Sequence, residues 1–245
     1  LVYNSEPDGY TLLASPPGPL AINRSLYQKL SYDSSKFEPV TIMAEVPNVL
    51  VVSPNFPARN VRELIAYAQA NPDKVNFASQ GNGSTSHLTA MMLQSMANIK
   101  MTHIAYKGTT PALTDIMGGQ VDIFFDNLSS SLPFHKAGKL RILAVADSKR
   151  SAVLPDIPTV QEAGIKGFKA VTWFGIVAPP GTPQPTIQKL NKAFVSVMKM
   201  PEVQKSFLEQ GAVPVADTPE NTKIFIRDEA VKWGELIKKT KTTVD

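Results

Sequence analysis

Residues 77–97, FASQGNGSTSHLTAMMLQSMA, join a short apolar stretch to a helix through two glycines and a cluster of hydroxyl side chains. Gly81 and Gly83 permit positive φ angles and let a ligand approach the backbone closely. Ser84 and Ser86 offer oxygens that can cap the helix. The free N–H groups of a first helical turn, together with the helix dipole, attract anions. The stretch therefore predicts either an anion site or a strand-to-helix turn that only caps its helix.

A second turn of the same kind lies in HIAYKGTTPALTDIMGGQVD, residues 103–122. Lys107 and Gly108 come before Thr109 and Thr110, and a proline follows in the first helical turn, where it is tolerated. Helix starts that follow successive parallel strands lie at the same end of a sheet, where α/β proteins bind ligands. The two turns together favour a small anionic ligand held by backbone N–H groups and hydroxyls.

The sequence does not show the coupled groups that catalysis needs. No Gly-x-Ser-x-Gly stretch occurs, and neither helix start matches a phosphate loop. His87 follows Ser86 directly, and adjacent helical residues do not face each other, so we interpret His87 as a capping or ligand-contacting residue rather than a general base. Asp122 and Asp126 share one face of a strand, which favours a structural or site-edge role. We expect no catalytic residue.

The composition argues against several kinds of binding partner. Of the 245 residues, 43% are apolar and 19% are charged, which is typical of a soluble globular protein. No apolar run approaches the roughly 20 residues that span a bilayer, so we expect no membrane insertion. The net charge of +4 is spread along the chain, which argues against a nucleic-acid partner. There is no cysteine, and the three histidines lack metal-binding spacing, so we expect no metal and no cofactor.

Strand-like and helix-like stretches alternate along most of the chain, which predicts an α/β fold with parallel sheets covered by helices. The predicted strands are residues 10–15, 48–53, 75–79, 102–106, 121–125 and 140–146. The predicted helices include residues 60–71, 182–199, 201–211 and 218–241.

Two longer apolar stretches, residues 41–54 and 169–180, differ from these strands because each carries a proline or glycine near its middle or end. Strands of this kind can cross between two α/β lobes. The expected division gives a continuous lobe and a discontinuous one: residues 46–171, and residues 1–45 with 172–245. Trp173 and Phe174 lie on the second of these strands, where packing in a core is favoured over stacking on a ligand.

Six stretches distributed over nearly the whole chain carry a further pattern. They are PDGYTLLAS (7–15), NRSLYQKLSYD (23–33), PNVLVVSPNFPARNVRELIAYAQANPDKVNFASQGNGSTSHL (47–88), YKGTTPALTDIMGGQVDIFFD (106–126), AGKLRILAVADSKRSAVLPDIPTVQEAG (137–164) and WFGIVAPPGTP (173–183). Together, and in one register, they resemble the Bug family, the solute-binding proteins of tripartite tricarboxylate transporters.

The resemblance implies a periplasmic, monomeric binding protein of the type II fold, with two lobes that are each a mainly parallel sheet flanked by helices. Two crossover strands would join the lobes, and a hinge would close them over a small organic carboxylate, either a dicarboxylate or an aromatic one. Membrane transporter subunits would be the partners. Family chains begin with a further strand–helix–strand unit that supplies part of the ligand site. We expect that part of the discontinuous lobe to be missing here.

The resemblance also implies where the ligand lies. Residues 79–87 and 107–110 would hold one carboxylate, and residues around Asp126 and Asn127, with Trp173 and Phe174, would line the cleft. Because both helix starts belong to one lobe, we expect residues 14–20 of the other lobe to meet the far end of the ligand. The predicted ligand-binding residues are Ser15, Ser79, Gly81, Asn82, Gly83, Ser84, Ser86, His87, Lys107, Gly108, Thr109, Thr110, Asp126, Asn127, Trp173 and Phe174.

Two other classes of protein stay open at this point. An α/β enzyme acting on a carboxylated substrate would need a coupled nucleophile, base and orienting group, which the sequence does not show. A sensor module that reports ligand occupancy to a signalling partner would carry the same cleft, and only its partner would set it apart.

Overall fold

The computed structural model describes residues 1–243, and the chain divides into two compact units. Unit 1 comprises Leu1–Glu45 and Thr172–Asp245, and unit 2 comprises Val46–Val171. One boundary falls inside the long strand β2 (Glu38–Val52), and the other falls at the first residue of β7 (Val171–Ala178). Both strands therefore contribute to a sheet in unit 1, and β2 continues into the sheet of unit 2.

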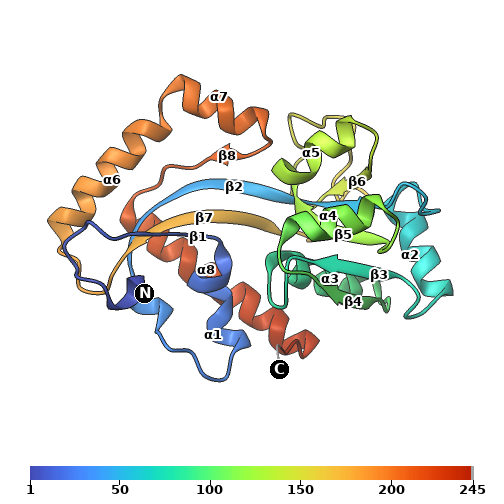
Figure 1. The fold of residues 1–245 in the computed structure, drawn as a ribbon, viewed down its shortest axis with the longest axis horizontal. Coiled ribbons are helices and arrows are strands. Elements are labelled where there is room, and N and C mark those ends of the chain that lie inside the picture. Colours follow the sequence, from blue (N-terminus) through green and yellow to red (C-terminus); the bar gives the residue numbers. More distant parts are fainter. Residues whose placement is uncertain (244–245) are drawn as a thin grey trace. The chain divides into compact units, whose positions relative to one another are not determined.

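In unit 2 the sheet has the order β6-β2-β5-β3-β4. The further strands are β3 (Asn76–Ser79), β4 (Thr102–Ala105), β5 (Ile123–Asn127) and β6 (Arg141–Val145). The helices, drawn in cyan to yellow-green in Figure 1, are α2 (Val61–Ala70), α3 (Thr85–Ala97), α4 (Thr109–Met117) and α5 (Leu128–Lys136). Apolar residues in β5 are buried, as expected for a central strand covered on both faces.

Strand direction in unit 2 follows from the connections. β3 pairs in parallel with both β4 and β5, and these strands are joined by helices, as the alternating pattern predicts. β2 runs antiparallel to β5 and to β6. It enters from unit 1 without a helical crossover, so the rule that makes helix-joined strands parallel does not apply to it.

Unit 1 has a sheet with the order β1-β7-β2 and with β8 paired to β2. It contains β1 (Leu13–Ser15), β8 (Val213–Pro214), α1 (Asn23–Leu26), α6 (Gln184–Met198), α7 (Pro201–Glu209) and α8 (Pro219–Thr240). Short helical turns lie at η1 (Val2–Asn4), η2 (Gly18–Ile22) and η3 (Ser34–Lys36). β1 pairs antiparallel with β7, and β8 pairs antiparallel with β2, so the expectation of a mainly parallel sheet is wrong for these pairs. No βαβ crossover joins the members of either pair, so nothing fixes them as parallel.

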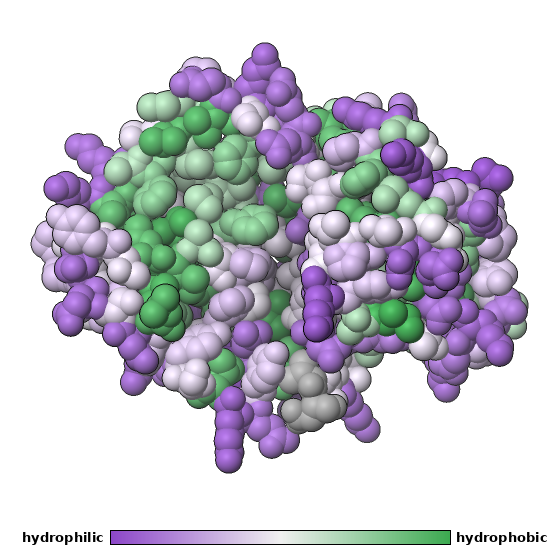
Figure 2. Space-filling model, viewed as in Figure 1, coloured by the Kyte–Doolittle hydropathy of each residue, from purple (hydrophilic) through white to green (hydrophobic). Residues whose placement is uncertain are grey.

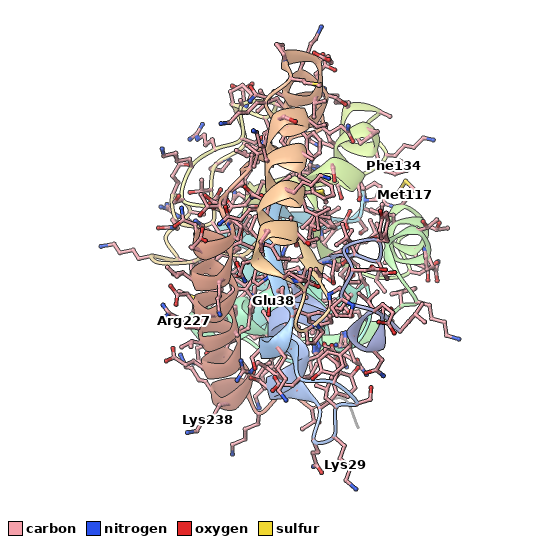
Figure 3. The ribbon with its side chains drawn as sticks, turned by 90° about the vertical axis from the view of Figure 1, so that its left-hand side faces the viewer. Lys29, Glu38, Met117, Phe134, Arg227 and Lys238 are labelled. Carbon is pink, nitrogen blue, oxygen red and sulfur yellow. The ribbon has the colours of Figure 1, made fainter. Side chains whose placement is uncertain are left out.

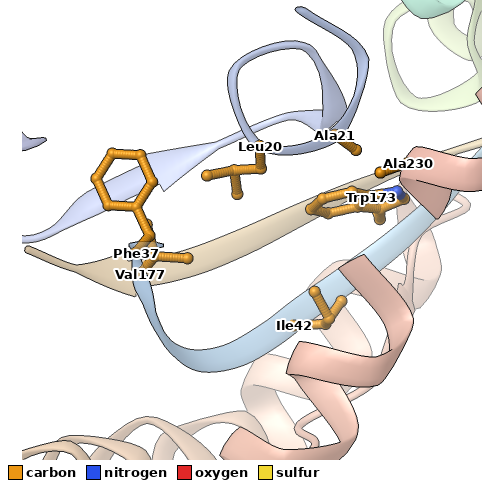
Figure 4. Close-up of a cluster of buried hydrophobic side chains, with 7 residues drawn as sticks. All are labelled: Leu20, Ala21, Phe37, Ile42, Trp173, Val177 and Ala230. Carbon is orange, nitrogen blue, oxygen red and sulfur yellow. The ribbon is translucent and has the colours of Figure 1, made fainter. Parts of the chain in front are cut away.

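Among the described residues, two apolar clusters contribute to the core of unit 1. One contains Leu20, Phe37, Val177 and Trp173, which gather between β7, η2 and α8 (Figure 4). The other lies between the strands and α6, where Leu190 and Phe194 are only partly buried. Apolar residues also gather beside α6 on the visible face of unit 1 (Figure 2).

Candidate functional site: three helix starts in unit 2

The candidate site follows from the order of three adjacent strands. β5, β3 and β4 lie side by side and run in parallel, and each leads into a helix: β5 into α5, β3 into α3 and β4 into α4. Their carboxyl ends meet one edge of the sheet, so three helix N-termini begin at that edge. Each N-terminus carries backbone N–H groups without intrahelical partners and the positive end of a helix dipole.

The loop before α3 is held by its own polar groups. Gly81 and Gly83 have φ angles of 135° and 73°, which glycine adopts without strain. Ser84 caps α3, because its Oγ accepts a hydrogen bond from the His87 N–H at 3.3 Å and donates to the Gly81 carbonyl at 2.7 Å. Asn82, at the tip of this loop, is exposed. The sequence predicted the cap correctly, and the loop is closed by the same hydroxyl.

Two other predicted hydroxyls are engaged inside the unit. Ser86 Oγ accepts a hydrogen bond from the Gln80 N–H at 2.9 Å. Ser79 Oγ lies 2.6 Å from His103 Nε2 and donates to the Gly81 carbonyl at 3.1 Å. Ser79 and Ser86 are buried, so these side chains shape the loop that presents the backbone N–H groups.

His87 is a neutral, buried ring. Its Nδ1 accepts a hydrogen bond from the Gly83 N–H at 3.1 Å, and its ring stacks on that of His103. Burial, and to a smaller extent the charge of His103, lowers the pKa of His87 to about 4. The pKa of His103 is also lowered by burial. The role as a capping residue rather than a base agrees with this geometry.

The start of α4 is joined to the α3 loop. Gly108 has a φ angle of 104°, and its N–H donates to the Gln80 carbonyl at 3.1 Å. No side chain caps the first turn of α4. Lys107 and Thr110 are exposed and Thr109 is half-buried. The first turn therefore offers backbone N–H groups, two hydroxyls and a nearby cation to a ligand.

Sequence reasoning did not find the third helix start, that of α5. Asn127 precedes the helix, but its side chain does not cap it, and Asn127 Oδ1 is buried without a hydrogen-bond partner among the described residues. Asp126 beside it accepts hydrogen bonds from Gln80 Nε2 at 3.0 Å and from Ser131 Oγ at 2.7 Å. Burial raises the pKa of Asp126 to about 6, against the lowering effect of these hydrogen bonds.

Gln80 lies within the predicted loop 79–87 but was not among the predicted binding residues, although it forms hydrogen bonds to groups at all three helix starts. Its N–H contacts Ser86 in α3, its carbonyl accepts from Gly108 at α4, and its side chain reaches Asp126 before α5. A glutamine in a loop carries no recognisable signal in a single sequence, because only the fold shows which elements it contacts.

The predicted residues of unit 1 lie apart from these groups in the chain and have local partners. Ser15 is buried and its Oγ donates to the Pro16 carbonyl at 3.0 Å. Trp173 is 1% exposed and its Nε1 donates to Glu229 Oε2 at 3.0 Å, which makes it a core residue, as the strand pattern favoured. Phe174 is half-buried.

Among residues 1–243, no group of three or more His, Cys, Asp or Glu side chains could hold a metal ion. Over the same residues, no helix combines the length and apolar character that crossing a bilayer requires.

The fold and the site define a two-lobed α/β solute-binding protein. Residues 1–242 match the family model described as "Tripartite tricarboxylate transporter family receptor". The chain belongs to this family, which is a family of solute-binding receptors and not of enzymes.

Three solved structures are similar over nearly the whole chain. "R. palustris Rpa4515 with adipate" is 33% identical with a TM-score of 0.94, over 99% of this chain and 81% of that chain. "Periplasmic binding protein BugD" is 34% identical with a TM-score of 0.90, over 99% and 82%. "MatC (Rpa3494) from Rhodopseudomonas palustris with bound malate" is 32% identical with a TM-score of 0.88, over 96% and 82%.

Proposed function

We propose that this receptor works in the periplasm, as a monomer, and that it binds a small dicarboxylate for the membrane subunits of a tripartite transporter. The single observation that carries the ligand class is the set of three helix N-termini at one edge of the unit 2 sheet. Such N-termini favour anions through free N–H groups and the helix dipole. The similar proteins solved with adipate and with malate support the same class, since both compounds are dicarboxylates.

One carboxylate would bind at the first turn of α4, where no side chain competes for the N–H groups. Lys107 would add a positive charge, and Thr109 and Thr110 would add hydroxyls. Asn127 Oδ1, buried and without a partner, would accept a hydrogen bond from a ligand hydroxyl such as that of a hydroxy acid.

The test places a negative charge at the start of α4. Thr110→Glu should weaken binding of adipate and of malate by about tenfold or more, because two like charges would lie within a Debye length of about 8 Å. The same change should stabilise the helix by about 0.3–1 kcal/mol, because an acidic residue suits a helix N-terminus. Loss of affinity with equal or higher stability is therefore the expected signature in calorimetric titration and thermal unfolding.

Gln120→Glu is the matched control, because it adds the same charge at an exposed position beyond the other end of α4. Its affinity for both acids should stay within about twofold of the wild type, given screening by salt. If Thr110→Glu and Gln120→Glu bind adipate and malate equally, the ligand does not lie at this helix start.

A further inference from the structure

Unit 1 contains a cavity of about 490 Å³ that does not involve the helix starts of unit 2. Its walls come from α8 on one side and from η2, α1, η3 and the beginning of β2 on the other. This volume lies in the range of about 300–1,000 Å³ that is usual for small-molecule sites. The proposed carboxylate site in unit 2 does not account for it.

The floor of the cavity is apolar. Leu20, Phe37, Val177 and Ala230 line it, and each is at least nine-tenths buried in the core cluster of unit 1 (Figure 4). Their side chains offer no hydrogen-bonding group, so the bottom of the cavity suits an alkyl or aryl group rather than a polar one.

The rim of the cavity is charged and mostly positive. Arg24, Lys223 and Arg227 line it, together with the single acidic residue Glu220. All four are exposed. Within residues 1–243, Arg24 and Lys223 form no ion pair, and Arg227 pairs with its neighbour Asp228 at 2.8 Å, a surface contact that contributes little. The positive charge at the rim is therefore available to a ligand.

One wall of the cavity is a row of side chains on α8, placed at helical spacing. The lining residues of this row are Glu220, Lys223, Ile224, Arg227 and Ala230; each lies three or four residues from another member, so they share one face of the helix. Ile224 is 49% exposed and lies against the apolar part of the cavity. The same face thus presents an apolar wall with two cations above it.

We propose that this cavity is a second binding site, which takes an amphipathic anion: an alkyl chain on the apolar floor and an anionic head group at the Arg24–Lys223–Arg227 rim. The occupant is a monocarboxylate with a medium-length chain, and the site differs in kind from that for a dicarboxylate. A short diacid would have to bury its second charge against Leu20 and Phe37, so the cavity rejects it.

The direct test is calorimetric titration of the 245-residue protein with hexanoate, octanoate and decanoate, each below its critical micelle concentration. Affinity should rise along the series by up to about fourfold per methylene, which corresponds to about 0.8 kcal/mol. Adipate at saturation should leave the affinity for decanoate unchanged. No binding of decanoate, or its displacement by adipate, would overturn the proposal, while adipate binding on its own still tests the proposed function separately.

The charge requirement is tested on α8. Lys223→Glu with Arg227→Glu should weaken decanoate binding by about tenfold, and the matched pair Lys238→Glu with Lys239→Glu should change it by no more than about twofold. Arg227 and Lys238 lie well apart along α8 (Figure 3). Decyltrimethylammonium, with the same chain and the opposite charge, should bind the wild type at least about tenfold more weakly than decanoate. Equal binding of the two amphiphiles, or equal loss in both variant pairs, would contradict an anion-selective rim.

Discussion

The rings of His87 and His103 stack face to face, with centroids 3.9 Å apart and planes inclined by 6°. Phe77 stacks on His103 with a centroid distance of 4.8 Å, so the pair continues an apolar stack in the core of unit 2. A charge on either imidazole would be buried beside the other ring. The stack is stable when both rings are neutral. The stability of the fold at the start of α3 should therefore depend on pH.

His87→Gln tests that link. The pKa of His87 is lowered from 6.5 to about 4, so the unfolded chain takes up this proton first as the pH falls. Stability from the neutral ring is complete above pH 6.5 and is lost between 6.5 and about 4. Relative to His87→Gln, which does not titrate, the wild type should lose about 3 kcal/mol over this window. Urea unfolding followed by circular dichroism measures the difference, and parallel stability curves would contradict it.

For Asp126→Asn, the change with pH in the free energy of unfolding, wild type relative to variant, should have the opposite sign. Burial raises the pKa of Asp126 from 3.8 to about 6, so the folded protein takes up this proton first. The protonated carboxyl contributes stability that is complete below pH 3.8 and lost as the pH rises through about 6. Relative to Asp126→Asn, the wild type should therefore gain about 3 kcal/mol as the pH falls through that window. If the wild type instead loses stability relative to the variant as the pH falls, the hydrogen bonds of Asp126 lower its pKa by more than burial raises it.

Gly108→Ala and Gly119→Ala separate backbone strain from ligand binding. Both glycines have positive φ angles, 104° and 73°, and an added Cβ meets no atom within 4 Å at either. Each substitution should cost about 1–3 kcal/mol in unfolding free energy through strain alone. Gly108 lies at the start of α4 and Gly119 just beyond its end, so adipate affinity should fall by about fivefold or more only in Gly108→Ala. Equal affinities would remove Gly108 from the site.

Trp173→Phe tests the assignment of Trp173 to the core. Trp173 Nε1 and Trp233 Nε1 both donate to Glu229 Oε2, at 3.0 Å and 2.9 Å. The substitution removes one of these hydrogen bonds and some buried volume, so unit 1 should lose about 1–3 kcal/mol. Adipate affinity should stay within about twofold. Trp233→Phe should behave in the same way, and a loss of affinity confined to Trp173→Phe would show that Trp173 contacts the ligand.

The fold was largely predictable where local signals and burial agree. The helix predicted at residues 60–71 is α2 at Val61–Ala70, capped by Asn60 Oδ1, which accepts from the Glu63 N–H at 2.9 Å. The stretch 218–241 is α8 at Pro219–Thr240, with Thr218 as its cap. Strand direction was less predictable, because β2 pairs in both units and its partners follow from tertiary contacts rather than from its own pattern.

The starts of α3 and α4 were predictable, because glycines and hydroxyls mark them, but the start of α5 was not. The sequence LSSSLPFHK carries a run of serines and places Pro133 inside the helix, both of which weaken a helix signal. The helix forms because Leu128 and Leu132 are buried and because Ser131 donates to Asp126 at 2.7 Å. These contacts join residues whose proximity depends on the fold.

We propose that backbone N–H groups at the starts of α3, α4 and α5 bind a dicarboxylate. Amide chemical shifts in a heteronuclear NMR titration with adipate measure this most directly. We expect the largest, saturable shifts at the first-turn amides for which the described residues supply no hydrogen-bond acceptor: Ser86 in α3, Thr109 and Thr110 in α4, and Ser129 in α5. Saturable adipate binding with these amides unmoved, and with the largest shifts elsewhere in the chain, would contradict it.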